Sequence, residues 1–496
     1  MLKRAFVSDS DSSASKRVRD DSDSDEPTLP TKAASSLKKN DQTSSTNTDV
    51  KKPVAKLASI FQPRVGPSSS ANGEKTSPIL KLKWLDPIGS NGTCLHGVYG
   101  EPQPCSKVAF YDLDGTLVRP KNGKTFPSKT DEYDFSFLFP TLNPSIVTRL
   151  RSQHDDGHAI VVITNQKQTQ YSGKNGLATW KKKMGHIAAA LDVPLRVFAA
   201  LGDDKYRKPR LGMWDEFNKS NLGVEVDRAA SFFVGDAAGR ERSRDHQDTD
   251  LKWALNAGIS FLTPEEYFLS QERDWGIPIR PWSPSALSAP APSLTGLVHD
   301  PSSEMTVVDL GNLSETAKTT ILGGDREQDA SEIILFVGAP ASGKTHLFTH
   351  IFAPQGYVHV NQDTLRTRDK CLRFVREIVT SNPPQSCVVD NTNRDKATRK
   401  YYVDLARELG VGIRCVYFDV PKVVCVHNNH FRAHHGPTRE EGERRSLLPY
   451  TAIEGFFKDR QVPQRAEGFS AAIVRVKWGW NGADEAVRAK YEMYYH

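Results

Sequence analysis

The hydrophobic positions of this chain gather in short runs that alternate with longer, partly polar segments. Residues 108–111, 159–163 and 230–234 are apolar, β-branched or aromatic, and each run ends in polar residues. Such runs are typical of buried parallel strands, and the helical spacing of residues 179–191 predicts a helix between two of them. The alternation therefore predicts an α/β fold whose functional residues lie at the carboxyl ends of the strands.

The same alternation returns in the second half, with predicted strands at residues 333–337, 358–360, 387–389 and 413–418. The first 78 residues are instead rich in Ser, Lys, Asp and Pro, and such a segment cannot bury enough apolar surface to offset the entropy of ordering it. Residues 282–301 are rich in Pro, Ser and Ala, as linkers are. The predicted organisation is a disordered tail at residues 1–78, a first domain at 79–281, a linker at 282–330 and a second domain at 331–496.

Composition adds little to this picture. The 496 residues include 66 Lys and Arg against 60 Asp and Glu, a formal net charge of +6. This mild excess permits nucleic-acid binding through local patches without requiring it. The six cysteines show no CxxC spacing, which is typical of reduced thiols in an intracellular protein. No apolar run has membrane-spanning length, so we expect a soluble protein without a membrane partner. We also expect a monomer.

The first candidate site is the motif DLDGT at residues 112–116, directly after an apolar run. The carboxylate of Asp112 is placed to attack phosphorus and form an acyl phosphate that water then hydrolyses. Asp114 is placed to protonate the leaving oxygen and later to deprotonate the water. Gly115 permits the tight turn, and the hydroxyl of Thr116 is a substrate contact. Two acids two residues apart also occur in solvated turns, but the preceding strand favours the catalytic interpretation.

Three later residues complete this set. Thr164 ends the second predicted strand and is placed to donate a hydrogen bond to a phosphoryl group, while Lys208 neutralises its charge. Asp236 ends the third strand, beside Asp112, and clustered carboxylates select Mg²⁺. We expect Asp245 and Asp250, on the following loop, to be solvated or structural. The predicted metal ligands here are Asp112, Asp114 and Asp236, and the ordered set resembles the haloacid-dehalogenase phosphatase superfamily, with its Rossmann-like fold.

The second candidate site is the motif GxxxxGKT at residues 338–345, between an apolar strand and a helical segment. This context is typical of the phosphate-binding loop of P-loop NTPases. Backbone N–H groups and the helix N-terminus face the phosphates of ATP, Lys344 spans the β- and γ-phosphates, and Thr345 holds Mg²⁺. The predicted ATP-binding residues are Gly338, Ala339, Pro340, Ala341, Ser342, Gly343, Lys344 and Thr345.

Phosphoryl transfer also needs a base for the acceptor hydroxyl. Asp363 follows the predicted strand at 358–360 and is our candidate. Asp390 ends another strand and suits metal or water positioning, while Asn391 and Thr392 are candidate substrate contacts or helix caps. Arg432 lies in a helical, basic segment that we interpret as a lid reaching the transferred phosphate, although an exposed basic helix is the alternative.

A DLDGT phosphatase followed by a GxxxxGKT kinase, with the segments VNQDTL, VVDNTN and HNNHFR, resembles the eukaryotic polynucleotide kinase 3′-phosphatase family over residues 80–480. The resemblance implies hydrolysis of 3′-phosphate termini through an aspartyl-phosphate, ATP-dependent phosphorylation of 5′-hydroxyl termini, and a role in DNA strand-break repair. It implies Asp112 as nucleophile, Asp114 as acid/base, Asp236 on Mg²⁺, Lys344 and Thr345 on ATP and Mg²⁺, Asp363 as kinase base and Arg432 in the lid.

Two departures bear on recruitment and substrate choice. Vertebrate members carry an N-terminal forkhead-associated domain, whereas residues 1–78 predict a tail that we expect to meet other repair proteins. Lys16, Arg17 and Arg19, beside Lys3 and Arg4, are typical of a nuclear import signal, although a solvated run of charges is the alternative. The expected location is the nucleus. Some members have Arg before the kinase base, where this chain has Gln362. Arg119, just after the nucleophile motif, is a candidate DNA contact.

Two other functions also fit parts of the pattern. One is a metabolite phosphatase fused to a small-molecule kinase, which would be saturated by a free nucleoside or sugar phosphate. The other is an inactive scaffold that only binds DNA ends or repair partners. The intact pairs Asp112/Asp114 and Lys344/Asp363 argue against the scaffold.

Overall fold

The described part of the chain lies C-terminal to the tail. The computed structural model describes residues 81–496 except 122, 125–126, 167–174, 241–244, 246, 274–282, 289–297, 301–304, 325–330 and 437–444. The predictions of a disordered tail that meets other repair proteins and of a nuclear import signal concern residues 1–78, which lie outside the described residues. No helix among the residues it does describe is long and apolar enough to cross a membrane.

The first folded region contains a seven-stranded sheet in the order β1-β2-β7-β6-β3-β8-β9. The strands β7, β6, β3, β8 and β9 run parallel, whereas β1 and β2 add an antiparallel edge. The bounds are β1 Lys83–Trp84, β2 Cys94–Tyr99, β3 Val108–Tyr111, β6 Ala159–Asn165, β7 Leu195–Ala200, β8 Phe232–Val234 and β9 Ser260–Leu262. The three strands predicted in this region are thus confirmed as β3, β6 and β8.

Helices cover both faces of this sheet. Neighbouring residues of each strand point to opposite sides, so each strand contributes to two cores. Tyr111 of β3 packs in one core with Leu150 and Met184 from α1 and α3. Phe110 packs in the other core with Phe217 and Trp253 from α4 and α5. The helices are α1 Ile146–Asp155, α3 Gly176–Leu191, α4 Gly212–Ser220, α5 Thr249–Ala257 and α6 Pro264–Leu269, and a hairpin of β4 Val118–Arg119 and β5 Ser136–Phe137 follows β3.

The second folded region contains another seven-stranded sheet, in the order β10-β11-β16-β15-β12-β14-β13. All its pairings are parallel except β10 with β11. The bounds are β10 Val298–Asp300, β11 Met305–Asp309, β12 Glu332–Gly338, β13 Val358–Val360, β14 Cys387–Val389, β15 Gly412–Phe418 and β16 Ile473–Lys477. The four strands predicted for this half are confirmed as β12, β13, β14 and β15.

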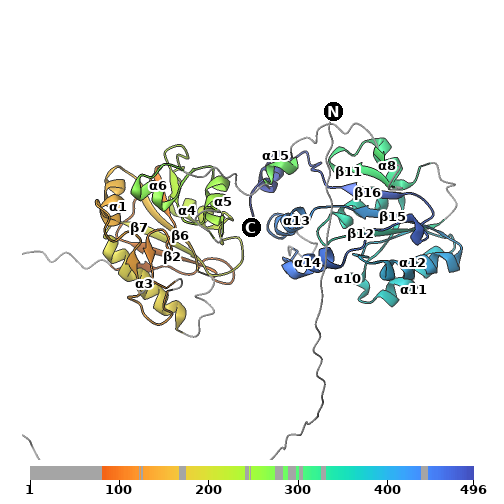
Figure 1. Ribbon diagram of the computed structural model, residues 1–496, viewed down its shortest axis with the longest axis horizontal. Coiled ribbons are helices and arrows are strands. Elements are labelled where there is room, and N and C mark those ends of the chain that lie inside the picture. Colours follow the sequence, from red (N-terminus) through yellow and green to blue (C-terminus); the bar gives the residue numbers. More distant parts are fainter. Residues whose placement is uncertain are drawn as a thin grey trace, which may run out of the picture. The chain divides into compact units, whose positions relative to one another are not determined.

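The second sheet is also covered on both faces. Val375 of α11 and Tyr402 of α12 pack with Leu335 of β12 on one face, and Figure 1 shows these two helices side by side. Val424 of α13 packs with Phe336 on the other face. The helices are α7 Ser285–Ser288, α8 Glu315–Leu322, α9 Lys344–Leu347, α10 Gln362–Leu365, α11 Arg368–Val379, α12 Lys396–Leu409, α13 Lys422–His434, α14 Tyr450–Asp459 and α15 Glu485–Tyr491. Single turns η1 Leu310–Asn312, η2 Phe348–Phe352, η3 Ala353–Gln355 and η4 Arg465–Glu467 complete the elements, η2 being π-helical.

The segment predicted as a linker at residues 282–330 is partly built into this second sheet. It contributes β10 and β11 to the sheet edge and α8 to its cover. Composition led to the linker prediction because Pro and Ser are frequent at residues 282–301. The strand β11 has only five residues and pairs with β16, a strand more than 160 positions further on, so no local signal marks it.

Candidate active sites

The first site lies at the carboxyl edge of the first sheet. The backbone N–H of Asp112, directly after β3, donates to the carbonyl of Val234 at the end of β8, at 2.9 Å. Because β3 also pairs in parallel with β6, the residues that follow these three strands meet at one edge. Asp112, Thr164 and Asp236 therefore come together, as the sequence predicted.

Lys208 is bound to two aspartates in this site. The residue is 97 % buried. Its ammonium group donates to Asp112 Oδ1 at 2.5 Å, to Asp250 Oδ1 at 2.8 Å and to the carbonyl of Ile163 at 2.9 Å. Burial alone would lower the pKa of Lys208, but the charges of Asp112 and Asp250 outweigh it and raise the pKa. Lys208 is therefore a cation held in place before any phosphate arrives.

Asp250 is not the solvated acid that was one of our two expectations for it. It lies in the first turn of α5 and is 99 % buried. Besides its pair with Lys208, it accepts a hydrogen bond from the backbone N–H of Ala237 at 3.1 Å. Asp250 is far from Asp112 in the sequence, and only the sheet brings the start of α5 close to Asp112. The sequence therefore did not indicate that Asp250 binds Lys208.

Three carboxylates form a group that suits a divalent cation. Oxygen atoms of Asp112, Asp236 and Asp250 all lie within 4.8 Å of one another. Elsewhere in the described part of the chain, no other group of three His, Cys, Asp or Glu side chains meets this criterion. An all-oxygen donor set is what Mg²⁺ prefers. Asp114, also predicted as a ligand, has its carboxylate outside this group.

Two glycines make room for this group. An added Cβ on Gly115 would lie 2.5 Å from Asp236 Oδ2, and one on Gly235 would lie 2.5 Å from Asp250 Oδ2. Both distances are too short for any side chain. The glycines therefore allow the two carboxylates to approach the backbone closely, which supports the fit of the group to a cation.

The three carboxyl groups lie close together, so their negative charges repel one another. Burial, with added repulsion from Asp250 and Asp236 and opposed by Lys208, raises the pKa of Asp112 well above its usual range. Burial and the charge of Asp250 raise the pKa of Asp236 to about 7. One lysine does not neutralise three carboxylates, so a divalent cation would favour their ionised forms.

Asp114 stands apart from these three carboxylates, of which Asp112 and Asp250 are buried. Its side chain is reached by solvent, yet it lies deep enough among protein atoms for desolvation to raise its pKa, against a hydrogen bond from Gln166. The amide nitrogen of Gln166 donates to Asp114 Oδ2 at 2.7 Å and to the hydroxyl of Thr164 at 2.9 Å. Gln166 had no predicted role, because a glutamine after a strand has no distinctive signal.

The two predicted substrate contacts of this site differ in exposure. Thr116 is fully buried, and its hydroxyl has no hydrogen-bond partner among the described residues. Arg119 lies on β4 and is exposed. The hairpin of β4 and β5 thus presents Arg119 to solvent immediately after the nucleophile motif.

The second site is the loop between β12 and α9. Gly343 adopts φ 96° and Ala341 φ 61°, left-handed conformations that turn the backbone sharply. The side chain of Lys344 is largely buried and donates to the carbonyls of Gly338 at 3.1 Å and Ala339 at 2.7 Å. Burial lowers the pKa of Lys344, opposed chiefly by the charge of Asp390. The predicted loop thus has its lysine drawn back over its own backbone.

Asp390 connects the loop to the neighbouring strands. Its Oδ2 accepts hydrogen bonds from the hydroxyl of Thr345 at 2.6 Å and from Nε2 of His359 at 3.0 Å. Although burial opposes it, the combined effect of His359, Lys344 and Thr345 lowers the pKa of Asp390. An ionised carboxylate beside the Thr345 hydroxyl fits the oxygen donors that Mg²⁺ requires in P-loop enzymes. His359 is a further residue that sequence analysis missed.

The candidate base Asp363 lies in the first turn of α10 and is exposed. Its backbone N–H donates to Asn361 Oδ1 at 2.7 Å, and the amide of Asn361 donates to the carbonyl of Asp390 at 2.8 Å. Asn391 Oδ1 accepts from the backbone N–H of Gln362 at 2.8 Å, so it supports α10. Thr392 is exposed. The base is therefore anchored through its backbone, while its carboxylate faces solvent.

Helix α13 contacts the loop on another side. Asn428 donates to the carbonyl of Ala341 at 3.1 Å, and Arg432 donates to Asn429 Oδ1 at 3.0 Å. The positive charge of Arg432 contributes to the lowered pKa of Lys344, so Arg432 lies within electrostatic reach of the loop. The arginine of the predicted lid therefore lies near the phosphate-binding loop.

Trp478, after β16, lies over the glycine of the same loop. A Cβ added to Gly343 would be 3.1 Å from the indole ring. Trp478 also lies 6.2 Å from Tyr491 of α15, between ring centroids. The loop is thus packed beneath an aromatic side chain from the C-terminal part of the chain.

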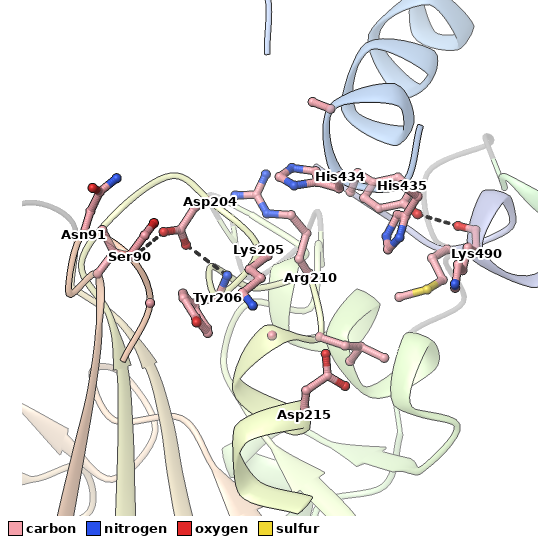
Figure 2. A pocket seen from close by; sticks show the side chains of 17 residues that line it. Ser90, Asn91, Asp204, Lys205, Tyr206, Arg210, Asp215, His434, His435 and Lys490 are labelled. Carbon is pink, nitrogen blue, oxygen red and sulfur yellow. Dashed lines mark hydrogen bonds between the residues drawn. The ribbon is translucent and has the colours of Figure 1, made fainter. Parts of the chain in front are cut away.

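A separate pocket of about 680 Å³ contains none of the predicted site residues. Figure 2 shows Asp204, Lys205 and Tyr206 among its lining residues, together with His434, His435 and Lys490. Its lining combines acidic and basic side chains, including Asp204, Asp215, Lys205 and Arg210. The pocket therefore presents charged groups of both signs.

The two sites define the class of the protein: a phosphatase with an aspartate nucleophile joined to a P-loop kinase. Two family models match the chain, one described as polynucleotide kinase 3 phosphatase at residues 107–268 and one described as an AAA domain at residues 333–452.

Relatives share both parts in one chain. The bifunctional polynucleotide phosphatase/kinase of Schizosaccharomyces pombe is 32 % identical over 372 residues, covering 75 % of this chain and 80 % of that protein. A putative bifunctional polynucleotide phosphatase/kinase of Acanthamoeba polyphaga mimivirus is 30 % identical over 355 residues, covering 66 % and 75 %. A polynucleotide 3′-phosphatase of Arabidopsis thaliana is 37 % identical over 177 residues, covering 33 % of this chain and 24 % of that protein. The chain belongs to the family of bifunctional polynucleotide phosphatase/kinases.

Proposed function

We propose that this protein prepares DNA strand breaks for repair, hydrolysing 3′-phosphate termini at the first site and phosphorylating 5′-hydroxyl termini with ATP at the second. The main support is that one chain of this family holds both an aspartate bound to a buried lysine and a phosphate-binding loop bound to a buried aspartate. A break with a 3′-phosphate and a 5′-hydroxyl needs both reactions before ligation.

In the phosphatase reaction, a carboxylate oxygen of Asp112 attacks phosphorus and the bond from phosphorus to the 3′ oxygen breaks. Asp114 gives its proton to that leaving oxygen. Water then attacks the aspartyl-phosphate and gives a proton to Asp114, releasing inorganic phosphate and restoring Asp112. Lys208 and the hydroxyls of Thr164 and Thr116 bind the phosphoryl oxygens.

In the kinase reaction, Asp363 accepts the proton of the 5′-hydroxyl while the oxygen of that hydroxyl attacks the γ-phosphorus of ATP. The bond to the bridging oxygen of ADP breaks, and Lys344 and Arg432 balance the developing negative charge. Asn391 and Thr392, beside the base, and Arg119 at the first site are the proposed contacts to the polynucleotide.

Mg²⁺ is the proposed metal at both sites. Asp112, Asp236 and Asp250 would hold it in the first site, and Thr345 with Asp390 in the second. When bound, it neutralises phosphate charge. The donor sets support this proposal, since both consist of oxygen atoms.

We also propose that the protein acts in the nucleus, as a monomer, and meets other repair proteins through its N-terminal tail. The support for the nuclear location is the basic sequence at residues 16–19 with Lys3 and Arg4. Alanine at Lys16, Arg17 and Arg19 in a fluorescently tagged full chain should shift it to the cytoplasm, and an unchanged nuclear signal would reject this import sequence.

The decisive experiment uses one nicked duplex with a 3′-phosphate and a 5′-hydroxyl at the nick, with Mg²⁺ and with or without ATP. We expect 3′-dephosphorylation without ATP and 5′-labelling only with labelled ATP. An excess of a free nucleoside 3′-phosphate should compete weakly. Strong competition would favour a metabolite enzyme, and a matched RNA nick that reacts faster would assign the activity to RNA.

A further inference from the structure

Gln166 is a buried residue in the phosphatase site for which the reaction above has no use. It directly follows β6 and is 93 % buried. Its backbone N–H donates to the carbonyl of Ala200 on β7 at 2.8 Å. The backbone of Gln166 is therefore fixed by the sheet, so its side chain starts from a rigid position.

The amide nitrogen of Gln166 binds two groups of the site at once. It donates to Asp114 Oδ2 at 2.7 Å and to the hydroxyl oxygen of Thr164 at 2.9 Å. An amide NH₂ group has two hydrogens, one for each acceptor. The acid/base and a proposed phosphate contact are thus connected through a single atom.

This arrangement distinguishes the two oxygens of Asp114. Oδ2 accepts the hydrogen bond from Gln166, whereas Oδ1 receives no hydrogen bond from the described residues. If Oδ2 carried the acid proton, that proton would lie against the N–H of the Gln166 amide. The acid proton is therefore directed to Oδ1. The side chain of Asp114 is open to solvent, and Oδ1 is the oxygen left for a substrate.

We propose that Gln166 is a positioning residue that fixes the Asp114 carboxyl group with Oδ1 as its proton-donating oxygen. In the first step the proton moves from Oδ1 to the 3′ oxygen as the bond from that oxygen to phosphorus breaks. In the second step Oδ1 takes a proton from the attacking water. This inference rests on the proposed phosphatase function and names a residue on which its acid/base step depends.

The test compares two substrates that differ in their need for a proton. A 3′-deoxyribose oxygen is a poor leaving group and needs the acid, whereas 4-nitrophenolate leaves without one. In the full chain, Gln166→Met keeps a side chain of similar length but has no donor. We expect kcat for a DNA 3′-phosphate to fall about 10²-fold, with KM changed less than about threefold and pre-steady-state nitrophenol release from 4-nitrophenyl phosphate lowered less than about fivefold.

A double-mutant cycle identifies the residue through which Gln166 acts. In an Asp114→Asn background, Gln166→Met should cause no further loss. Gln153→Met is the matched control, because Gln153 also hydrogen-bonds within this folded region, to His158 and Tyr267, but not to Asp114. We expect it to retain wild-type activity, and the kinase activity of every variant reports a folded second site.

Equal losses for the two substrates, or additive losses in the cycle, would overturn the proposal for Gln166 and leave the phosphatase function intact. Failure of the wild-type protein to release phosphate from either substrate would instead reject the proposed function. If Gln166→Met does not fold, Gln166→Asn keeps the amide but shortens its reach, and the same selective loss with DNA is expected.

Discussion

In the phosphatase site the proposed nucleophile is buried and bound to a lysine, whereas in the kinase site the proposed base is exposed. Asp112 is paired with Lys208 in the interior, while Asp363 lies open on the short helix α10. In the proposed phosphatase reaction a carboxylate of the protein forms a covalent bond with the phosphorus of the substrate. A fixed position of that carboxylate favours the attack. The kinase transfers a phosphoryl group between two bound molecules, so its acceptor has to reach the base from solvent. In each site the carboxylate proposed to exchange a proton with the substrate, Asp114 or Asp363, is exposed. The proposed nucleophile, Asp112, is buried.

The largest expected effect separates the two sites at the nucleophile. Asp112→Asn keeps the shape of the side chain but cannot form the aspartyl-phosphate, so 3′-phosphate release should fall on the order of 10⁴-fold or more. Labelling of 5′-hydroxyl ends with ATP should stay within about twofold. Both are measured on the nicked duplex, and a parallel loss of kinase activity would contradict the independence of the sites.

The reciprocal change is Lys344→Ala in the phosphate-binding loop. It removes the buried ammonium group that balances charge on the transferred phosphate, so the kinase kcat should fall about 10³-fold. Release of 3′-phosphate without ATP should be unchanged. An exposed lysine of the same folded region, changed as Lys400→Ala, is the matched control and should retain the kinase activity.

A steric change tests the close approach of the carboxylates. In Gly235→Ala the new Cβ would meet Asp250 Oδ2 at 2.5 Å, displacing the acid that binds Lys208. We expect phosphatase kcat to fall about 10²-fold, and kinase activity to persist. Gly185→Ala has no atom within 4 Å of its new Cβ and should leave both rates unchanged. Full phosphatase activity in Gly235→Ala would show that Asp250 is dispensable.

The smallest effect concerns stability against pH. The pKa of Asp236 is raised to about 7 in the folded protein, against ~3.9 for an unperturbed aspartate. The folded state therefore binds more protons at Asp236 between these values. The contribution of Asp236 to stability is fully present below pH ~4 and declines as the pH rises to about 7.

In EDTA, the thermal midpoint of the first folded region should fall by a few degrees over this pH interval, relative to Asp236→Asn. Mg²⁺ should raise the midpoint most above pH 7, where the carboxylates are ionised. Differential scanning calorimetry of the full chain measures both effects. A wild-type curve parallel to that of Asp236→Asn would contradict the raised pKa.

The sequence predicted the two sheets and most motif residues because those signals are local. Asp112 and Lys344 each belong to a motif of fixed spacing that follows an apolar run. The place of Asp112 at a strand end and of Lys344 at the start of a helix therefore did not depend on the rest of the chain. Strands β11 and β16 were missed, since the first is short and lies in a segment whose composition suggested a linker. Their pairing depends on residues more than 160 positions apart.

The missed functional residues share a different cause. Asp250 reaches Lys208 only because α5 begins beside β8, and His359 reaches Asp390 only because β13 pairs with β14. Gln166 reaches Asp114 across the edge between β6 and β3. In each case the contact depends on the order and register of strands, which single-sequence patterns do not specify. The sequence thus predicted the reacting groups but not the residues that hold them.

The tryptophan above the phosphate-binding loop gives the kinase half a built-in optical reporter. Since the Trp478 indole lies over Gly343, a nucleotide entering the loop changes the polarity around that ring. Titration with ADP should therefore alter the intrinsic emission of the protein, and Trp478→Phe should remove most of that change. Nucleotide occupancy of the second site can then be followed continuously while phosphate release from the first is recorded in the same cuvette.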